Sequence, residues 1–486
     1  MAAVVRLKAR WAQLVRRSSR WLLLPFGLVI AWWAGSAAPL EGGHRTLVLT
    51  MAFAGVAIPV AWALVPSRLR QGFMSIELPM LLLLLSTLTL RVRTAADLAY
   101  NPLDPAAQFR VLCVLTAGLL GAVALTRPAS RTTAQRLPLP FFLYATYIVV
   151  VFLGAWLSLN LTLTAYRAVE LLAGVLVVAG AWKSHGRGAL PRMEATLYWF
   201  AVVLIASAWI GALVAPSSGI QQFKNTAVPI QWELSGVFPA ISSNGLGELA
   251  VFLIFWSPLR TQFWRSRTRP SWLAFFLCGV GLITLLAAQY RTGYIATAVG
   301  LIVVLVATKR WVPATVFVLI MAAVLSWFPS IVTEAEPYAL RGQTVQEAQG
   351  LSSRVDWWAA SIPVWEKSPF LGKGLLTATR FEVLAPLGEV TTAGIHSTWV
   401  EALVGTGVVG VAMILLALAW AWRRAIRAAR GPDGWILPIV IVSVITVRSI
   451  TGTTIEVFGY DVLLFLWLSL ALAAHPAGST QTPIQA

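Results

Sequence analysis

The chain is short of charged residues and of cysteine, and each shortage restricts what it can be. Only 12% of its 486 residues are charged, whereas soluble domains usually carry about 25%. Because 58% of the residues are hydrophobic and the mean hydropathy is +0.76, a soluble globule and a disordered chain are excluded. The two cysteines, Cys113 and Cys278, lie inside apolar runs, which excludes a disulfide-framed secreted module.

Histidine is also scarce, and no arrangement of side chains predicts a cofactor. The histidines are too scattered for a metal-ligand set; they are His44, His185, His396 and His475. The stretch Gly405–Gly410 matches G-x-G-x-x-G, but no strand precedes it and it lies inside a hydrophobic run. Its small residues therefore indicate close helix packing rather than a dinucleotide site. We expect neither a metal nor another cofactor.

Long apolar runs, by contrast, are abundant. A bilayer core of about 30 Å needs about 20 apolar residues per helix, and the candidate segments are 20–37, 46–65, 74–92, 108–126, 138–160, 167–183, 197–215, 246–258, 271–289, 293–308, 311–330, 397–422, 434–452 and 458–474. The short segments 246–258 and 293–308 are interpreted as re-entrant, broken or buried by neighbours. We predict an all-α polytopic membrane protein with about 12 to 14 transmembrane helices, and no cleavable signal peptide.

The net charge of +18 follows from membrane topology. With the N-terminus in the cytoplasm, the cytoplasmic segments hold 24 of the 37 lysines and arginines, and basic loops mark the cytoplasmic face. This distribution predicts that both termini are cytoplasmic. It also predicts contact with anionic lipid headgroups and no role in nucleic-acid binding.

One outer loop is much longer than the rest. We divide the chain into N-terminal transmembrane helices (1–330), this loop region (331–395), C-terminal transmembrane helices (396–475) and a cytoplasmic tail (476–486). Loops of this length are usually functional. A capping box at Ser353–Asp356 predicts a helix with a Trp-rich face suited to the membrane interface, which Pro363 kinks or ends. A turn is predicted at 368–374.

Charged residues at the outer ends of spans are candidates for function. Arg291 lies where two spans meet with almost no loop, and its guanidinium either binds an anion such as phosphate or reaches lipid headgroups. Arg354 opens the loop helix and is either a diphosphate ligand or a solvated helix-end charge. His396 begins the next span as a general base or as an interfacial cap. Arg341 and Lys367 have weaker cases.

Five further charged residues lie within spans or at their ends. Arg167 and Glu170 are three residues apart, which favours an intrahelical ion pair. Arg448 and Glu456 allow a similar interpretation. Glu401 enters a span, where it either pairs with a basic residue or faces a polar cavity.

These motifs together resemble the O-antigen ligase and polymerase superfamily of bacterial inner-membrane proteins. The matching stretches are Tyr290–Gly293, Ser353–Trp358 with Ser368–Gly374, His396–Ser397 with Glu401, Gly405 and Gly410, and Asn244 before a span. The resemblance covers roughly 240–455. Gln289 and Tyr290 stand where the family usually has a serine before the arginine.

Within the superfamily the chain looks most like an O-antigen ligase of the WaaL type. That resemblance implies transfer of a polysaccharide from undecaprenyl diphosphate to lipid A–core oligosaccharide at the periplasmic face, without a metal or nucleotide. On this view His396 takes the acceptor proton, Arg291 and Arg354 hold the diphosphate, and Arg341 and Arg167 are secondary lipid-diphosphate contacts. The alternatives are an O-antigen polymerase, a protein O-oligosaccharyltransferase or, from another class, a transporter or flippase.

Overall fold

A computed structural model of the chain describes residues 76–88, 104–126, 136–222, 232–237, 239–260, 272–309, 315, 354–389, 394–431 and 434–475. The predicted spans 20–37, 46–65 and 311–330 lie outside these residues. So do Arg341, the first residue of the predicted capping box (Ser353) and the tail.

The described part of the chain is predominantly helical, which confirms the predicted fold class. Its main helices are α5 (Leu78–Ser86), α7 (Pro105–Thr126), α8 (Leu139–Ala155), α9 (Leu161–His185), α10 (Ala189–Val214), α12 (Ser243–Arg260), α13 (Trp272–Ala288), α14 (Arg291–Ala307), α18 (Arg354–Glu366), α19 (Thr398–Arg430), α20 (Leu437–Thr451) and α21 (Tyr460–Ala474). Three stretches are long and apolar enough to cross a membrane, namely Pro105–Thr126, Leu161–Val214 and Thr398–Arg430. Shorter apolar helices accompany them.

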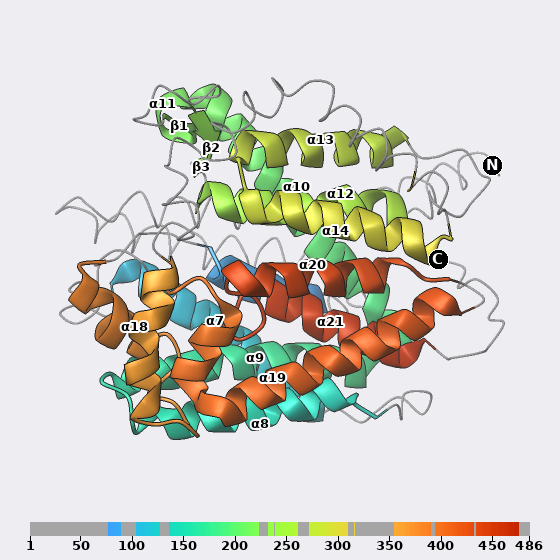
Figure 1. Cartoon of the computed structure of the whole chain (residues 1–486). Helices are drawn as coiled ribbons and strands as arrows, with labels where there is room; N and C mark the ends of the chain where they lie inside the picture. The colour runs from blue at the N-terminus through green and yellow to red at the C-terminus, as the bar shows by residue number, and fades with distance from the viewer. Residues whose placement is uncertain are drawn as a thin grey trace, which may run out of the picture.

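The long helices run side by side, and α18 lies across one end of them (Figure 1). In this arrangement α7 packs on α9, α8 on α19, α12 on α13, and α14 on α20. Helix α21 is buried on nearly every side, from Tyr460 to Leu472. A helix that is apolar all round and enclosed by its neighbours forms the core of the bundle.

Large apolar side chains also point outward from the bundle. On α7 Leu115 and Leu119 are 54% and 65% exposed, and on α13 Phe276 and Ile283 are 66% and 58% exposed. A protein in water rarely leaves such continuous apolar faces uncovered. These faces, together with the long apolar helices, identify an integral membrane protein.

For the short predicted segment 246–258, burial by neighbouring helices is confirmed, and neither short segment is broken. Helix α12 is continuous through Pro258 and almost fully buried by its neighbours, and α14 is continuous as well. The break lies instead in α19, where Gly407 has φ 65° and ψ −170°. Hydropathy could not locate it, because apolar residues continue on both sides of this glycine.

The loop before α19 satisfies the backbone groups that the break leaves without helical partners. The amides of Lys373 and Gly374 donate to the carbonyls of residues 404 and 405 over 2.9 and 3.1 Å. In return, the amides of residues 408 and 409 donate to the carbonyls of Pro369 and Phe370 over 2.9 and 3.4 Å. Main-chain polar groups inside a membrane protein need such partners, so this loop and the broken helix form one unit.

The glycines of the G-x-G-x-x-G stretch make this contact possible. A side chain at Gly405 would meet the backbone of Leu375, and one at Gly407 would meet Phe370. The expectation of close packing is confirmed: the loop approaches Gly405 and Gly407, and Gly410 lies against Tyr147 of α8.

Helix α18 corrects two expectations about the long loop. Pro363 does not end the helix, which continues to Glu366. Its tryptophans do not form an exposed interfacial face: Trp358 and Trp365 are half-buried against a small apolar cluster, while Val355 and Ile362 are exposed. The predicted turn at 368–374 is present.

Short strands precede α12, in the part of the chain between the predicted spans 197–215 and 246–258. Strand β1 (Ile220–Gln222) pairs antiparallel with β2 (Trp232–Leu234), and β3 (Gly236–Val237) pairs with β4 (Ala240–Ile241). The side-chain amide of Gln289 donates to the carbonyl of Trp232 over 2.7 Å. The strands are thereby attached to the junction between α13 and α14.

Candidate active site

The predicted tight junction between two spans is present at Arg291. Helix α13 ends at Ala288, Gln289 takes a left-handed conformation with φ 49°, and α14 begins at Arg291. Tyr290 is buried at this turn against Gly247 of α12, where there is no space for a side chain. Arg291 itself is half-buried.

The end of α20 brings α14 and α18 together. The hydroxyl of Thr292 lies 2.7 Å from that of Thr451, and the guanidinium of Arg354 donates to the Thr451 carbonyl over 2.9 Å. The last carbonyls of a helix lack intrahelical partners, so a cation stabilises this position. Arg354 is therefore held at a helix end, and Arg291 is the immediate neighbour of Thr292.

His396 lies beside Arg354. It precedes α19 with φ 51°, and its ring centroid is 6.2 Å from that of Trp357. Burial, and then the charge of Arg354, lower the pKa of His396 to about 4. The imidazole is therefore neutral near pH 7, as a proton acceptor must be. The structure thus brings two predicted residues of the site into direct electrostatic contact.

The first turn of α19 is attached to the segment that follows α20. The Thr398 amide donates to the Gly452 carbonyl over 3.0 Å, and its hydroxyl lies 2.9 Å from that of Thr454. The Thr454 amide donates to Glu456 over 2.9 Å. Burial raises the pKa of the Glu456 carboxyl to about 8, so this acid is mostly protonated near pH 7.

The predicted pairing of Arg448 with Glu456 is wrong. Arg448 is buried and donates to both oxygens of Asp461 over 2.9 and 2.8 Å, and it also pairs with Glu248 of α12. Sequence reasoning did not identify either acid, although each is a carboxylate inside an apolar segment. Their partner is distant in sequence, so spacing along one helix could not reveal it.

The predicted pair of Arg167 and Glu170 is confirmed, with 2.7 Å between their charged atoms. Arg110 of α7, which sequence reasoning missed, reaches the same carboxylate over 3.2 Å. Arg167 is also close enough to Glu401 for their charges to interact. Glu401 accepts hydrogen bonds from the amides of Leu376 and Ile395 and from the Thr379 hydroxyl.

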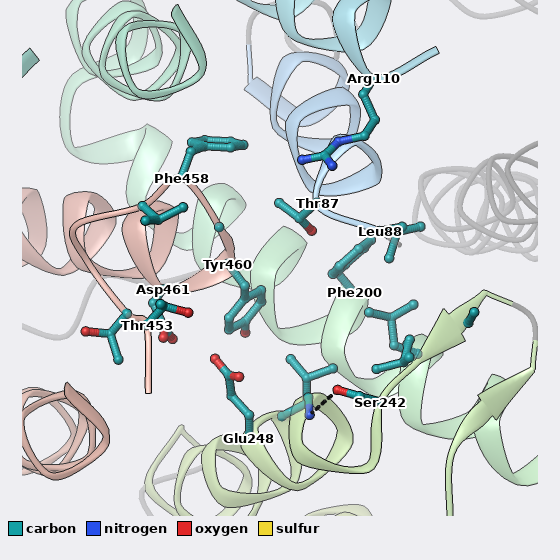
Figure 2. A pocket seen from close by; sticks show the side chains of 18 residues that line it. Thr87, Leu88, Arg110, Phe200, Ser242, Glu248, Thr453, Phe458, Tyr460 and Asp461 are labelled. Carbon is teal, nitrogen blue, oxygen red and sulfur yellow. Dashed lines mark hydrogen bonds between the residues drawn. The ribbon is translucent and has the colours of Figure 1, made fainter. Parts of the chain in front are cut away.

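The segment that carries Thr453 and Thr454 also lines a cavity of about 270 Å³ (Figure 2). Charged groups and aromatic rings line it together, including Arg110, Glu248, Asp461, Phe200, Phe458 and Tyr460. Arg291, Arg354 and His396 do not line this cavity. Thr454 connects the two regions, because it lines the cavity and bonds to the first turn of α19.

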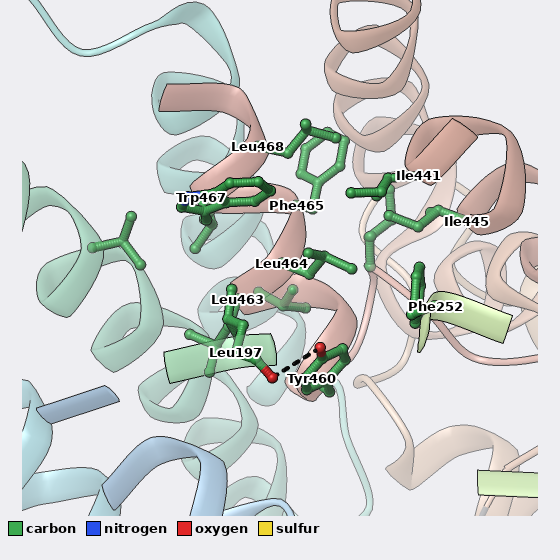
Figure 3. Packing of buried hydrophobic residues seen from close by; sticks show 14 of the residues in the cluster. Leu197, Phe252, Ile441, Ile445, Tyr460, Leu463, Leu464, Phe465, Trp467 and Leu468 are labelled. Atoms are coloured by element: carbon green, nitrogen blue, oxygen red, sulfur yellow. Dashed lines mark hydrogen bonds between the residues drawn. The ribbon is translucent and has the colours of Figure 1, made fainter. Parts of the chain in front are cut away.

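The wall that carries Asp461 and Tyr460 is well packed (Figure 3). The Tyr460 hydroxyl donates to the Leu197 carbonyl of α10 over 3.2 Å, and its ring lies 6.0 Å from that of Phe252. Phe465 and Trp467 continue the packing along α21. The position of the buried charges is therefore set by the core of the bundle.

Fold and site together define a polytopic helical membrane protein with arginine and histidine gathered at one end of its helices. Residues 273–415 match the family model described as O-antigen ligase, so this region of the chain is similar to the O-antigen ligase and polymerase superfamily. A search of curated proteins gave no match. The matched region holds Arg291, Arg354 and His396, and this similarity supports a glycosyltransferase-like function of the ligase or polymerase type in the O-antigen pathway.

Proposed function

We propose that the protein is the ligase: it transfers O-antigen polysaccharide from undecaprenyl diphosphate to lipid A–core oligosaccharide. The reaction takes place at the periplasmic face of the bacterial inner membrane, with both termini of the chain in the cytoplasm. The observation that carries the proposal is the closeness of a neutral His396, which lies against Trp357 of α18, to the charge of Arg354 inside the family-matched region. A base for a sugar hydroxyl and a cation for a diphosphate are the two groups that this transfer needs.

His396 is proposed to take the proton of the acceptor hydroxyl. The acceptor oxygen forms a bond to the anomeric carbon of the donor sugar as the bond from that carbon to the diphosphate breaks. Undecaprenyl diphosphate leaves, and the anomeric centre is inverted. Arg354 and Arg291 bind the diphosphate and stabilise the charge that grows on it.

The pairing of these residues links donor binding to acceptor activation. The charge of Arg354 lowers the pKa of His396 in the free enzyme. A bound diphosphate neutralises part of that charge, so the imidazole becomes more basic when the donor is in place. Arg167 and Arg341 are secondary candidates for contact with the lipid diphosphate.

Arginines supply the positive charge in this proposal, so we expect transfer to continue in excess EDTA. Abolition by the chelator, with recovery on adding a divalent cation, would contradict an arginine-only diphosphate site.

The test is a transfer assay on the purified full chain in nanodiscs. Undecaprenyl-diphosphate glycan is supplied with one acceptor at a time: lipid A–core, a second lipid-linked glycan, or a Ser/Thr peptide. We expect only lipid A–core to be elongated. Growth of the lipid-linked glycan would identify a polymerase, and growth of the peptide a protein O-oligosaccharyltransferase.

Site variants complete the assay. We expect His396→Ala and Arg291→Ala each to lower transfer by at least about 100-fold, with donor affinity reduced only in the arginine variant. Glycan movement across vesicle membranes without any covalent transfer would support a flippase instead.

A further inference from the structure

Two residues beside the proposed site have a backbone conformation that side chains other than glycine disfavour. Leu376 has φ 60° and His396 has φ 51°. A bulky residue in the left-handed region persists only where its surroundings hold it, and such residues occur often at active sites. The two positions are 20 residues apart in sequence, so their shared conformation needs a shared cause.

One carboxylate bonds to the backbone at Leu376 and at the residue before His396. Glu401 is fully buried in the first turn of α19 and accepts a hydrogen bond from the Leu376 amide over 3.1 Å. It also accepts from the amide of Ile395, the residue before His396, over 3.5 Å. The hydroxyl of Thr379 donates to the same carboxylate over 2.8 Å.

The peptide that joins Ile395 to His396 is held from the other side by α18. The indole of Trp358 donates to the Ile395 carbonyl over 3.0 Å. Ile395 is fully buried. With Glu401 on its amide and Trp358 on its carbonyl, this residue has little freedom, and the direction of the His396 side chain is fixed through it.

We infer that Glu401 is a positioning residue that holds His396, together with the 375–379 turn, in the orientation that proton transfer needs. The inference rests on the proposed function, in which His396 is the base. Glu401 does not reach the reacting atoms: its hydrogen-bond donors are two backbone amides and one hydroxyl. A carboxylate suits this task because it accepts several hydrogen bonds at once and donates none.

The competing explanation is that Glu401 only stabilises the fold. Substitution of a matched acid in the same region distinguishes this explanation from the positioning role. Glu382 belongs to the π-helical turn η3 (Thr379–Leu384) and pairs with Lys373 over 2.6 Å. We expect Glu401→Gln to lower kcat about 10-fold or more, because the amide keeps only one acceptor oxygen, with KM for donor and acceptor little changed. Glu382→Gln should leave kcat within about twofold.

A double variant tests whether Glu401 acts through His396. If it does, His396→Ala with Glu401→Gln is no slower than His396→Ala alone, because residues that work as a unit are not additive. A further 10-fold loss in the double variant would overturn the inference.

Glycine at position 376 supplies a rescue. Glycine adopts φ 60° without strain, so Leu376→Gly should restore several-fold of the kcat lost in Glu401→Gln. A general loss of packing would not be repaired by removing a side chain. Absence of rescue, with normal folding of the double variant, would overturn the positioning role.

NMR of labelled histidine provides a readout that does not depend on activity. The His396 signal should shift in Glu401→Gln and stay in place in Glu382→Gln. A shifted signal with fully active His396→Ala would refute the base assignment and leave the contact intact. An unshifted signal and wild-type kcat in Glu401→Gln, with inactive His396→Ala, would refute only the positioning role.

Discussion

His396 has an arginine beside it, whereas a catalytic histidine is usually oriented by a carboxylate. Together with burial, this arginine makes the imidazole a weak base in the empty site, with a pKa of about 4. The weakly basic imidazole stays unprotonated while no donor is bound. The same arrangement lets an anion at Arg354 increase the basicity of His396.

We therefore expect the His396 imidazole to titrate with a pKa of about 4 in the donor-free protein and at a higher value with pyrophosphate bound or in Arg354→Gln. Burial persists in both cases, so the pKa should stay below its usual value of about 6.5. Histidine NMR measures the titration, and the signal missing from His396→Asn assigns it. A pKa unaffected by Arg354→Gln would show that the two side chains do not interact.

Two buried acids near the site should respond differently to amide substitution. Asp461 compensates Arg448, whose side chain is 2% exposed, so Asp461→Asn should cost up to about 3–5 kcal/mol in the free energy of unfolding. Glu456 has its pKa raised to about 8 by burial, and Glu456→Gln should change stability by less than about 1 kcal/mol. Thermal unfolding in detergent compares the two variants. Equal destabilisation would show that Glu456 is ionised.

At the scale of single residues, the sequence identifies the basic side chains of the site better than it identifies the acids that pair with buried arginines. The order of motifs indicated that Arg354 and His396 act together, and the structure places them side by side. It could not indicate that Glu248 and Asp461 pair with Arg448. Such a pair depends on how α12, α20 and α21 pack, and packing has no signature in spacing along the chain.

At the scale of elements, hydropathy found the helices but not the irregularity in α19. Apolar residues continue through Gly407, so the hydropathy pattern predicts one uninterrupted helix. The segment 369–374, which bonds to the break, is predicted only as a turn. The break becomes understandable once the backbone hydrogen bonds between the two are known.

Alanine at Gly407 should destabilise the protein more than alanine at another left-handed glycine. Gly388 has φ 81° with open space around it, so Gly388→Ala should cost only the left-handed strain of about 1–2 kcal/mol. At Gly407, φ 65°, the new methyl group would also collide with the Phe370 backbone. The difference in melting temperature between the two variants measures this collision. Equal melting temperatures would mean that the loop can move away freely.

At the scale of the whole molecule, composition alone indicated the membrane environment, and a described helix lies in each predicted span outside 20–37, 46–65 and 311–330. The charge distribution predicts an orientation, with α18 outside and the turn between α9 and α10 inside. The positions of the described helices follow from hydropathy, whereas their ends do not: α5 ends at Ser86 and α19 continues to Arg430. The small strands before α12 do not follow from it either, because segments of two or three residues have no periodicity to detect.

Cysteine labelling in cells tests this orientation. On a background with Cys113 and Cys278 replaced by alanine, single cysteines are introduced at Glu366 and Arg187, both of which are exposed. We expect a membrane-impermeant maleimide to label Glu366→Cys in intact cells and Arg187→Cys only after the inner membrane is opened. The reverse pattern would invert the topology and place the proposed site in the cytoplasm.

The contact between the 369–374 loop and the broken α19 is made by main-chain atoms on both sides. Main-chain bonding is indifferent to the side chains of Phe370 and Leu371 but depends on how many residues the segment contains. Apart from Gly372 and Gly374, whose left-handed backbone leaves no space for a side chain, the loop should therefore accept substitutions. It should reject a single insertion or deletion, since one extra residue would shift all four bonds out of alignment. The length of the segment, together with these two glycines, is what the contact requires.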